Sequence, residues 1–169
     1  MPREVIRKGI VKGMELLGGP DRYHIDRQVV GGVPVAYVPH NPQTPSTEWR
    51  GTLLWLHGGA YEYGTAASAV GFGARYAFQA GLDTVGVDYR LAPEHPFPAG
   101  LNDVLAVYRA RLAAGHAAEK HAVGGDSAGG GLTLAFLLAA KAEGLPLPKA
   151  ARDVPLGRAP SEHRGQRPV

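Results

Sequence analysis

The spacing of apolar residues predicts a helix at the start of the chain and a β-hairpin after it. Within residues 4–17 apolar side chains recur at near-helical intervals, and Gly18-Gly19-Pro20 follows as a stop. Residues 23–30 and 33–38 are extended runs separated by Gly31-Gly32, a pattern typical of a hairpin. Residues 40–49, with several Pro, Ser and Thr, are expected to form a surface loop.

From residue 52 onward, short apolar runs alternate with longer segments of helical character. The predicted strands are 52–56, 84–87 and 122–123, and the predicted helices are 68–80, 101–112 and 132–142. This alternation is typical of an α/β fold with a mostly parallel sheet, right-handed crossovers and helices on both faces.

The last twenty residues lose this pattern. Residues 150–169 contain four Arg, three Pro and two Gly with few apolar positions, so we expect a disordered tail. The predicted organisation is an N-terminal helix (1–19), a main α/β domain (20–149) and this tail (150–169). We expect the ending to reflect a truncated or frameshifted reading frame, which would leave the strand before residue 127 without an outer neighbour. Self-association through that exposed sheet edge is then expected.

Composition and charge exclude several functional classes. Hydrophobic residues make up 44% and charged residues 20% of the 169 positions, as in ordinary globular proteins. The net charge of +3 is too small to indicate nucleic-acid binding, and the absence of cysteine excludes disulfides and a thiolate nucleophile. No apolar run suggests a signal peptide or membrane anchor, so a cytoplasmic protein is the default expectation. The seven histidines lack metal-ligand spacing and no phosphate loop occurs, so neither a metal nor another cofactor is expected.

The sequence GDSAG at residues 125–129 is the strongest chemical signal. It fits the pattern G-x-S-x-G between a predicted strand and a predicted helix, where the nucleophilic serine of many hydrolases is held on a tight turn. The pattern makes Ser127 a candidate nucleophile. Its place at a helix N-terminus would also help to stabilise negative charge that develops nearby.

A second glycine-rich segment, His57-Gly58-Gly59-Ala60, directly follows the predicted strand 52–56. Backbone N–H groups from such a loop, together with that of the residue after the nucleophile, here Ala128, can bind a developing oxyanion. His57 could be read as the general base, but we interpret it as a residue that braces this loop through a hydrogen bond, because it leads a glycine turn and is not expected to face the serine.

Three blocks in this order resemble the hormone-sensitive-lipase family of bacterial esterases: 57–60 (HGGA), 88–99 (DYRLAPEHPFPA) and 125–130 (GDSAGG). The resemblance covers about residues 20–148 and implies the N-terminal portion of an α/β-hydrolase fold, with an incomplete C-terminal half. It further implies that Gly58, Gly59 and Ala128 form the oxyanion hole and that the N-terminal helix belongs to a cap. Within the middle block we expect Arg90 and Glu94 to form an internal ion pair.

A catalytic triad needs a histidine and an acid after the serine in this fold. Downstream of Ser127 the chain has one histidine, His163, and three acids, Glu143, Asp153 and Glu162. Glu143 is expected to close a helix and the others to lie in the disordered tail. We therefore expect the triad acid and base to be missing from this chain.

The sequence thus favours a serine carboxylic-ester hydrolase that cleaves short-chain acyl esters or lactones through an acyl-serine intermediate. Because of the missing groups, we expect the chain to be inactive alone. The alternatives are a receptor-like protein that binds a small molecule without catalysis and a truncated, non-functional gene product. The expected partner is a small ester, with no nucleic acid and no membrane.

Overall fold

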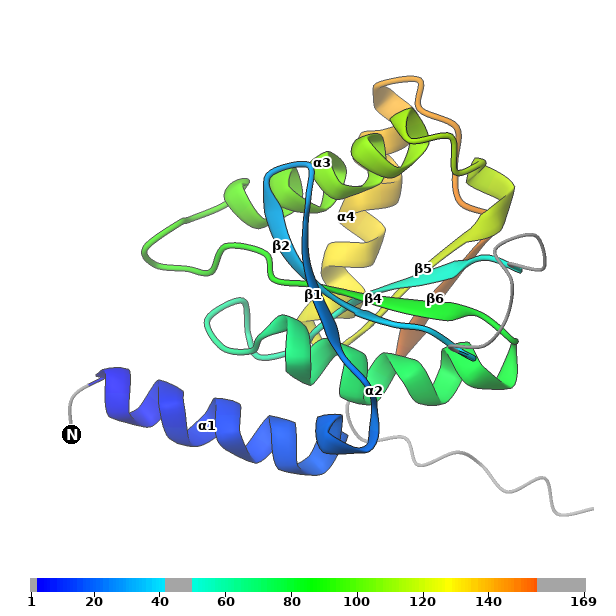
Figure 1. The fold of residues 1–169 in the computed structure, drawn as a ribbon. Coiled ribbons are helices and arrows are strands. Elements are labelled where there is room, and N and C mark those ends of the chain that lie inside the picture. The colour runs from blue at the N-terminus through cyan, green and yellow to red at the C-terminus, as the bar shows by residue number, and fades with distance from the viewer. Residues whose placement is uncertain (1–2, 42–49, 155–169) are drawn as a thin grey trace, which may run out of the picture.

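The computed structural model describes residues 3–41 and 50–154, which form a six-stranded sheet with helices on both faces (Figure 1). The sheet order is β1-β2-β4-β3-β5-β6. The strands are β1 (Asp26–Val30), β2 (Val33–Val38), β3 (Thr52–Leu56), β4 (Asp83–Val87), β5 (His121–Asp126) and β6 (Ala150–Val154).

The strand directions confirm the predicted α/β fold class. β1 and β2 form an antiparallel hairpin, and β2 pairs antiparallel with β4. β4, β3, β5 and β6 run parallel to one another. The hairpin turn places Gly31 and Gly32 at φ 60° and 80°, the left-handed conformation that two-residue hairpin loops require.

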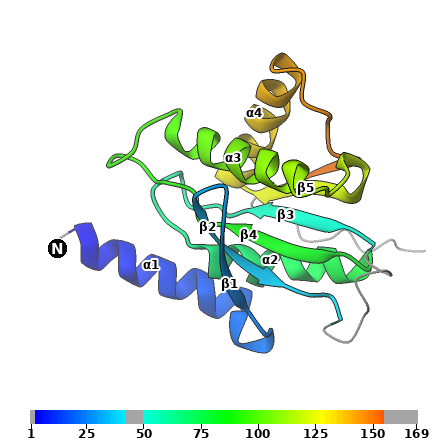
Figure 2. The ribbon, with the colours of Figure 1, turned by 45° about the horizontal axis from the view of Figure 1, so that its top comes forward.

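The described residues form four α-helices: α1 (Arg3–Gly18), α2 (Ala66–Gln79), α3 (Ala99–Ala113) and α4 (Ala128–Ala142). The short 3₁₀ helices η1 (Pro20–Arg22) and η3 (Ala118–Lys120) lie in connections between these elements. Figure 2 shows α3 and α4 on one face and α2 on the other, with α1 packed against α2. The predicted helices are confirmed, whereas the assignment of α1 to a cap stays a prediction.

The core is divided between the two faces of the sheet, because successive side chains of a strand point to opposite sides. In β3, Leu54 and Leu56 belong to the cluster that contains Val104 and Phe136 of α3 and α4. The intervening Trp55 packs with Ala69 and Ala77 of α2. Since both faces of β3 are covered, all five of its residues are buried, as expected for a strand in the middle of a parallel sheet.

The prediction of disorder from residue 150 onward is wrong for residues 150–154. These residues form β6, which pairs in parallel with β5 from Ala150 to Val154. The strand before Ser127 therefore has the outer neighbour that we expected it to lack. Residues 150–153 of β6 are exposed, which explains why they lack the apolar run that would have indicated a strand. The rest of the predicted tail, 155–169, lies outside the described residues, and self-association through the sheet edge stays a prediction.

Candidate active site

Ser127 occupies the turn between β5 and α4, as the sequence pattern predicts. Its φ and ψ are 52° and −118°, a conformation that side-chain-bearing residues rarely adopt. Hydrogen bonds hold this backbone: the Ser127 N–H donates to the Val154 carbonyl (3.0 Å), and the Ser127 carbonyl accepts from the N–H groups of Gly130 and Gly131 (3.0 and 3.2 Å). β6, which the sequence analysis did not predict, therefore helps to fix the nucleophile turn.

The two glycines of the motif are required by close packing. A Cβ on Gly129 would overlap the carbonyl oxygen of Leu56 in β3, and a Cβ on Gly125 would overlap the backbone of Gly129. Neither glycine has a positive φ, so the strained conformation is confined to the serine. The absence of side chains lets the start of α4 lie directly against β3, with Ser127 at the carboxyl end of β5.

Asp126 links this turn to the loop of residues 57–65, called the glycine loop below. One carboxylate oxygen of Asp126 accepts from the Gly58 N–H (3.1 Å) and the other from Trp55 Nε1 (3.1 Å). The Gly58 N–H, one of the predicted oxyanion donors, is thus engaged with a carboxylate of the protein. Sequence reasoning missed the role of Asp126, although its place next to the serine is the signal that could have found it.

Three successive residues of the glycine loop have a positive φ: Gly59 (113°), Ala60 (54°) and Tyr61 (62°). A tight turn closes this segment, because the N–H groups of Glu62 and Tyr63 both donate to the Gly59 carbonyl (2.9 Å each). Successive N–H groups in such a conformation can form a concave anion-binding nest. Ala128 follows Ser127 and is the first residue of α4, so its N–H is among those without a partner inside the helix.

His57 is buried and braces the glycine loop, which agrees with its predicted structural role. Its Nδ1 lies 2.8 Å from the Gly58 carbonyl oxygen, and its ring stacks on Tyr89 with the ring centroids 4.2 Å apart. The Tyr89 hydroxyl donates to the His57 carbonyl (2.6 Å). Nε2 has no hydrogen-bond partner among the described residues, and burial lowers the pKa of the ring. His57 is therefore a neutral, packed side chain.

A cavity of about 380 Å³ lies beside the glycine loop. Ala60 and Tyr61 line one side, and Leu132 and Ala135 of α4 line another. The remaining wall comes from the loop of residues 88–98, called the proline loop below, and the start of α3; it includes Tyr89, Arg90, His95, Phe97 and Leu101. The lining is mostly apolar, as in sites for small organic ligands, although Ser127 itself is not part of the wall.

The expected ion pair between Arg90 and Glu94 is wrong. Arg90 instead binds the buried carboxylate of Asp103 in α3, with Nη2–Oδ1 and backbone N–Oδ2 distances of 2.8 Å each. Glu94 binds Arg7 of α1. Spacing along the chain suggested a local pair, but α3 and α1 bring better-placed partners to the proline loop.

Of the acids downstream of Ser127, only Asp153 is shown to lie in a different place from the prediction. Asp153 lies on β6 with its carboxylate against Gly130 at the start of α4. Glu143 follows the end of α4, as expected, and forms an ion pair with Arg109. Glu162 and His163 lie outside the described residues. The described part of the chain thus brings together the nucleophile turn and the glycine loop, and it leaves the base unassigned.

Residues 3–41 and 50–154 contain no cluster of three or more His, Cys, Asp or Glu side chains that could hold a metal ion. In the same described residues, no helix has both the length and the apolar character needed to span a bilayer.

Comparison with known proteins shows which family this fold and sequence resemble. A family model described as "alpha/beta hydrolase fold" matches residues 53–160. LipR of Mycobacterium tuberculosis, named as a candidate acetyl-hydrolase, is 39% identical over 131 residues, or 78% of this chain. An acetyl-hydrolase of Streptomyces hygroscopicus is 40% identical over 107 residues, or 63% of this chain. A solved esterase from the bacterial hormone-sensitive lipase family superposes with a TM-score of 0.75 over 86% of this chain, at 38% identity.

The chain spans only part of these proteins. It covers 41% of the length of LipR, 36% of the Streptomyces acetyl-hydrolase and 49% of the solved esterase.

Proposed function

The chain belongs to the α/β-hydrolase fold family with esterase relatives, and on this basis we propose that it supplies the nucleophile and oxyanion hole of a serine carboxylic-ester hydrolase. The observation that carries the proposal is the strained backbone of Ser127, at φ 52° on the turn from β5 into α4. Strain of this kind persists only where the surrounding structure maintains it, and it is concentrated at functional sites.

In the proposed reaction the Ser127 oxygen attacks the carbonyl carbon of an ester while a base removes its proton. The carbonyl oxygen becomes an oxyanion in a tetrahedral intermediate. Collapse of this intermediate expels the alcohol, which takes up the proton, and leaves an acyl-serine. Water then attacks the acyl-serine through a second tetrahedral intermediate, which releases the carboxylic acid and restores the serine.

We assign the oxyanion donors to the N–H groups of Gly59, Ala60 and Ala128. Ala60 replaces Gly58 in the set predicted from the sequence, because the Gly58 N–H donates to Asp126. Gly59 and Ala60 belong to the left-handed segment, and Ala128 lies on the other side of the turn, at the start of α4. Each donor of this kind can contribute about 3 kcal/mol to stabilisation of the transition state.

The base and acid of the triad are not assigned to described residues. His57 is packed on Tyr89 and hydrogen bonded within the glycine loop, so it is not available to Ser127. We infer that this chain alone hydrolyses esters weakly. An enzyme with an incomplete triad can retain about 10³–10⁴-fold acceleration over water through the oxyanion hole and binding.

The substrate class we propose is a small ester with a short acyl group. The names of LipR and the Streptomyces relative as acetyl-hydrolases support this size. The cavity beside the glycine loop supports it as well, because its volume of about 380 Å³ and its apolar walls suit a compact organic group.

The test is hydrolysis of p-nitrophenyl acetate and butyrate by the purified chain, with the Ser127→Ala variant as control. We expect slow turnover that falls, in the Ser127→Ala variant, to the residual rate contributed by the oxyanion hole and binding. A fluorophosphonate probe, which should add its phosphonyl group to Ser127, provides a second measurement by mass spectrometry. Equal rates in both proteins together with no labelling of Ser127 would refute the proposal for this chain.

A further inference from the structure

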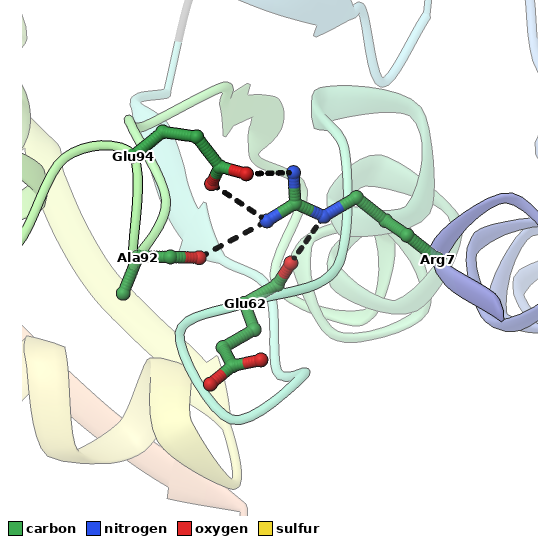
Figure 3. A network of polar contacts seen from close by, with 4 residues as sticks. All are labelled: Arg7, Glu62, Ala92 and Glu94. Carbon is green, nitrogen blue, oxygen red and sulfur yellow. Dashed lines mark hydrogen bonds and ion pairs between the residues drawn. The ribbon is translucent and has the colours of Figure 1, made fainter. Parts of the chain in front are cut away.

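Arg7 of α1 connects the N-terminal helix with the two loops that border the candidate site (Figure 3). Its Nε donates to the Glu62 carbonyl of the glycine loop (2.9 Å), and its Nη2 donates to the Ala92 carbonyl of the proline loop (3.0 Å). The same guanidinium forms a forked ion pair with the Glu94 carboxylate, at 3.2 and 3.0 Å. One planar cation thus holds acceptors from two loops more than fifty residues away in the sequence.

The Glu62 carbonyl is close to the strained part of the glycine loop. Glu62 directly follows Ala60 and Tyr61, at φ 54° and 62°, and its N–H closes the turn onto Gly59. Left-handed conformations cost about 1–2 kcal/mol per residue, so the surrounding structure has to maintain them. Arg7 fixes the carbonyl at the end of this segment, and the Ala92 N–H fixes the Tyr61 carbonyl next to it (2.9 Å).

A second contact from α1 reaches the far end of the same loop. Glu15 accepts from the Thr65 hydroxyl (2.9 Å), and Thr65 is the N-cap residue of α2. α1 itself is held against α2 by the close approach of Gly18 to Gly71, and by a hydrogen bond from Arg75 to the Leu17 carbonyl (3.3 Å). The helix therefore contacts the glycine loop at Glu62 and at Thr65 while resting on the body of the domain.

We propose that Arg7 is a positioning residue for the oxyanion donors of the glycine loop. The ion pair with Glu94 is partly exposed, with side-chain exposures of 26% and 52%, and contributes little by itself. The effect comes from the two backbone carbonyls, because they tie the Ala60–Tyr61 segment to the proline loop and to α1. Without Arg7 the segment would relax toward right-handed conformations, and its N–H groups would turn away from the oxyanion. The inference rests on the proposed esterase function.

The test compares Arg7→Met, Arg7→Lys and Arg75→Met in the full chain. Arg75→Met is the matched control, because it removes a bond between α1 and α2 without touching either loop. Hydrogen–deuterium exchange should rise at least about threefold in peptides covering 58–64 in Arg7→Met, and remain near the wild-type rate in Arg75→Met. Arg7→Lys, which keeps the charge, should lie between the two.

Turnover of p-nitrophenyl butyrate gives the second readout. The Ser127-dependent kcat should fall about tenfold or more in Arg7→Met with little change in KM, because small displacements of catalytic groups can cost up to about a hundredfold. Thermal unfolding midpoints check that all variants fold. Unchanged exchange in 58–64, or equal effects of Arg75→Met, would overturn the inference. If the wild type shows neither Ser127-dependent turnover nor labelling of Ser127, the proposed function fails for this chain, while the exchange data still decide the role of Arg7.

Discussion

Lowering the pH from about 7.5 to about 5 should reduce the free energy of unfolding, because His121 has to remain neutral in the folded protein. His121 begins β5 and is 1% exposed. Its Nε2 accepts from Arg111 Nε (2.9 Å), its Nδ1 lies 2.9 Å from the Ala117 carbonyl oxygen, and Arg111 also donates to the Thr52 hydroxyl (2.7 Å). A proton on Nε2 would remove the acceptor and place a second cation beside Arg111.

The size of the effect follows from the pKa of His121. Burial lowers this pKa from the ordinary value of 6.5 to about 4, and the charge of Arg111 adds to the decrease. Between these two values the unfolded chain binds the proton more readily than the folded protein does, so stability falls as the pH falls through the window. Across the full window the free energy of unfolding falls by about 3 kcal/mol, and between pH 7.5 and pH 5 it falls by about 2 kcal/mol. Burial also lowers the pKa of His57, which acts in the same direction.

Urea unfolding followed by circular dichroism at several pH values between about 5 and 7.5 measures this dependence. A His121→Asn variant should be less stable at pH 7.5 and should show a shallower dependence on pH. His24→Gln, at an exposed position, is the matched control and should retain the wild-type slope. A wild-type stability that does not change over this range, or an unchanged slope in His121→Asn, would refute the reasoning.

Two substitutions test how the nucleophile turn is held. Asp126→Asn replaces one of the two carboxylate oxygens that accept hydrogen bonds by an N–H donor. The free energy of unfolding, measured with urea, should fall by about 2 kcal/mol, and Ser127-dependent turnover should fall too. A variant as stable as the wild type would contradict the proposed link through Asp126. Gly129→Ala should destabilise the protein by at least about 2 kcal/mol, because the added Cβ would overlap the Leu56 carbonyl. The control Gly9→Ala, at a position on α1 with open space around it, should stabilise the protein by up to about 1 kcal/mol. Similar effects of the two substitutions in thermal unfolding would argue against close packing at Gly129.

Much of the fold was predictable because it depends on local patterns. The hairpin followed from two glycines between extended runs, and the strands β3, β4 and β5 followed from short buried runs between helices. β6 was missed because its exposed residues are alanine or charged, with no run of large apolar side chains, and its partner, β5, is distant in sequence. Only the pairing between Ala150–Val154 and β5 identifies it as a strand.

For the candidate site, sequence motifs alone were enough to predict the proposed nucleophile and the segment that lies beside it. G-x-S-x-G and the glycine-rich segment have conformational requirements that few residue types meet, so short motifs predict them. The folded structure then shows that one of the predicted oxyanion donors, the Gly58 N–H, already has a partner within the protein. The engagement of Gly58 with Asp126, the pairing of Arg90 with Asp103 and the reach of Arg7 to Glu62 all join segments that are far apart in the chain. Such partners are chosen by distance and geometry in the folded protein, and composition or spacing along the sequence carries no record of them.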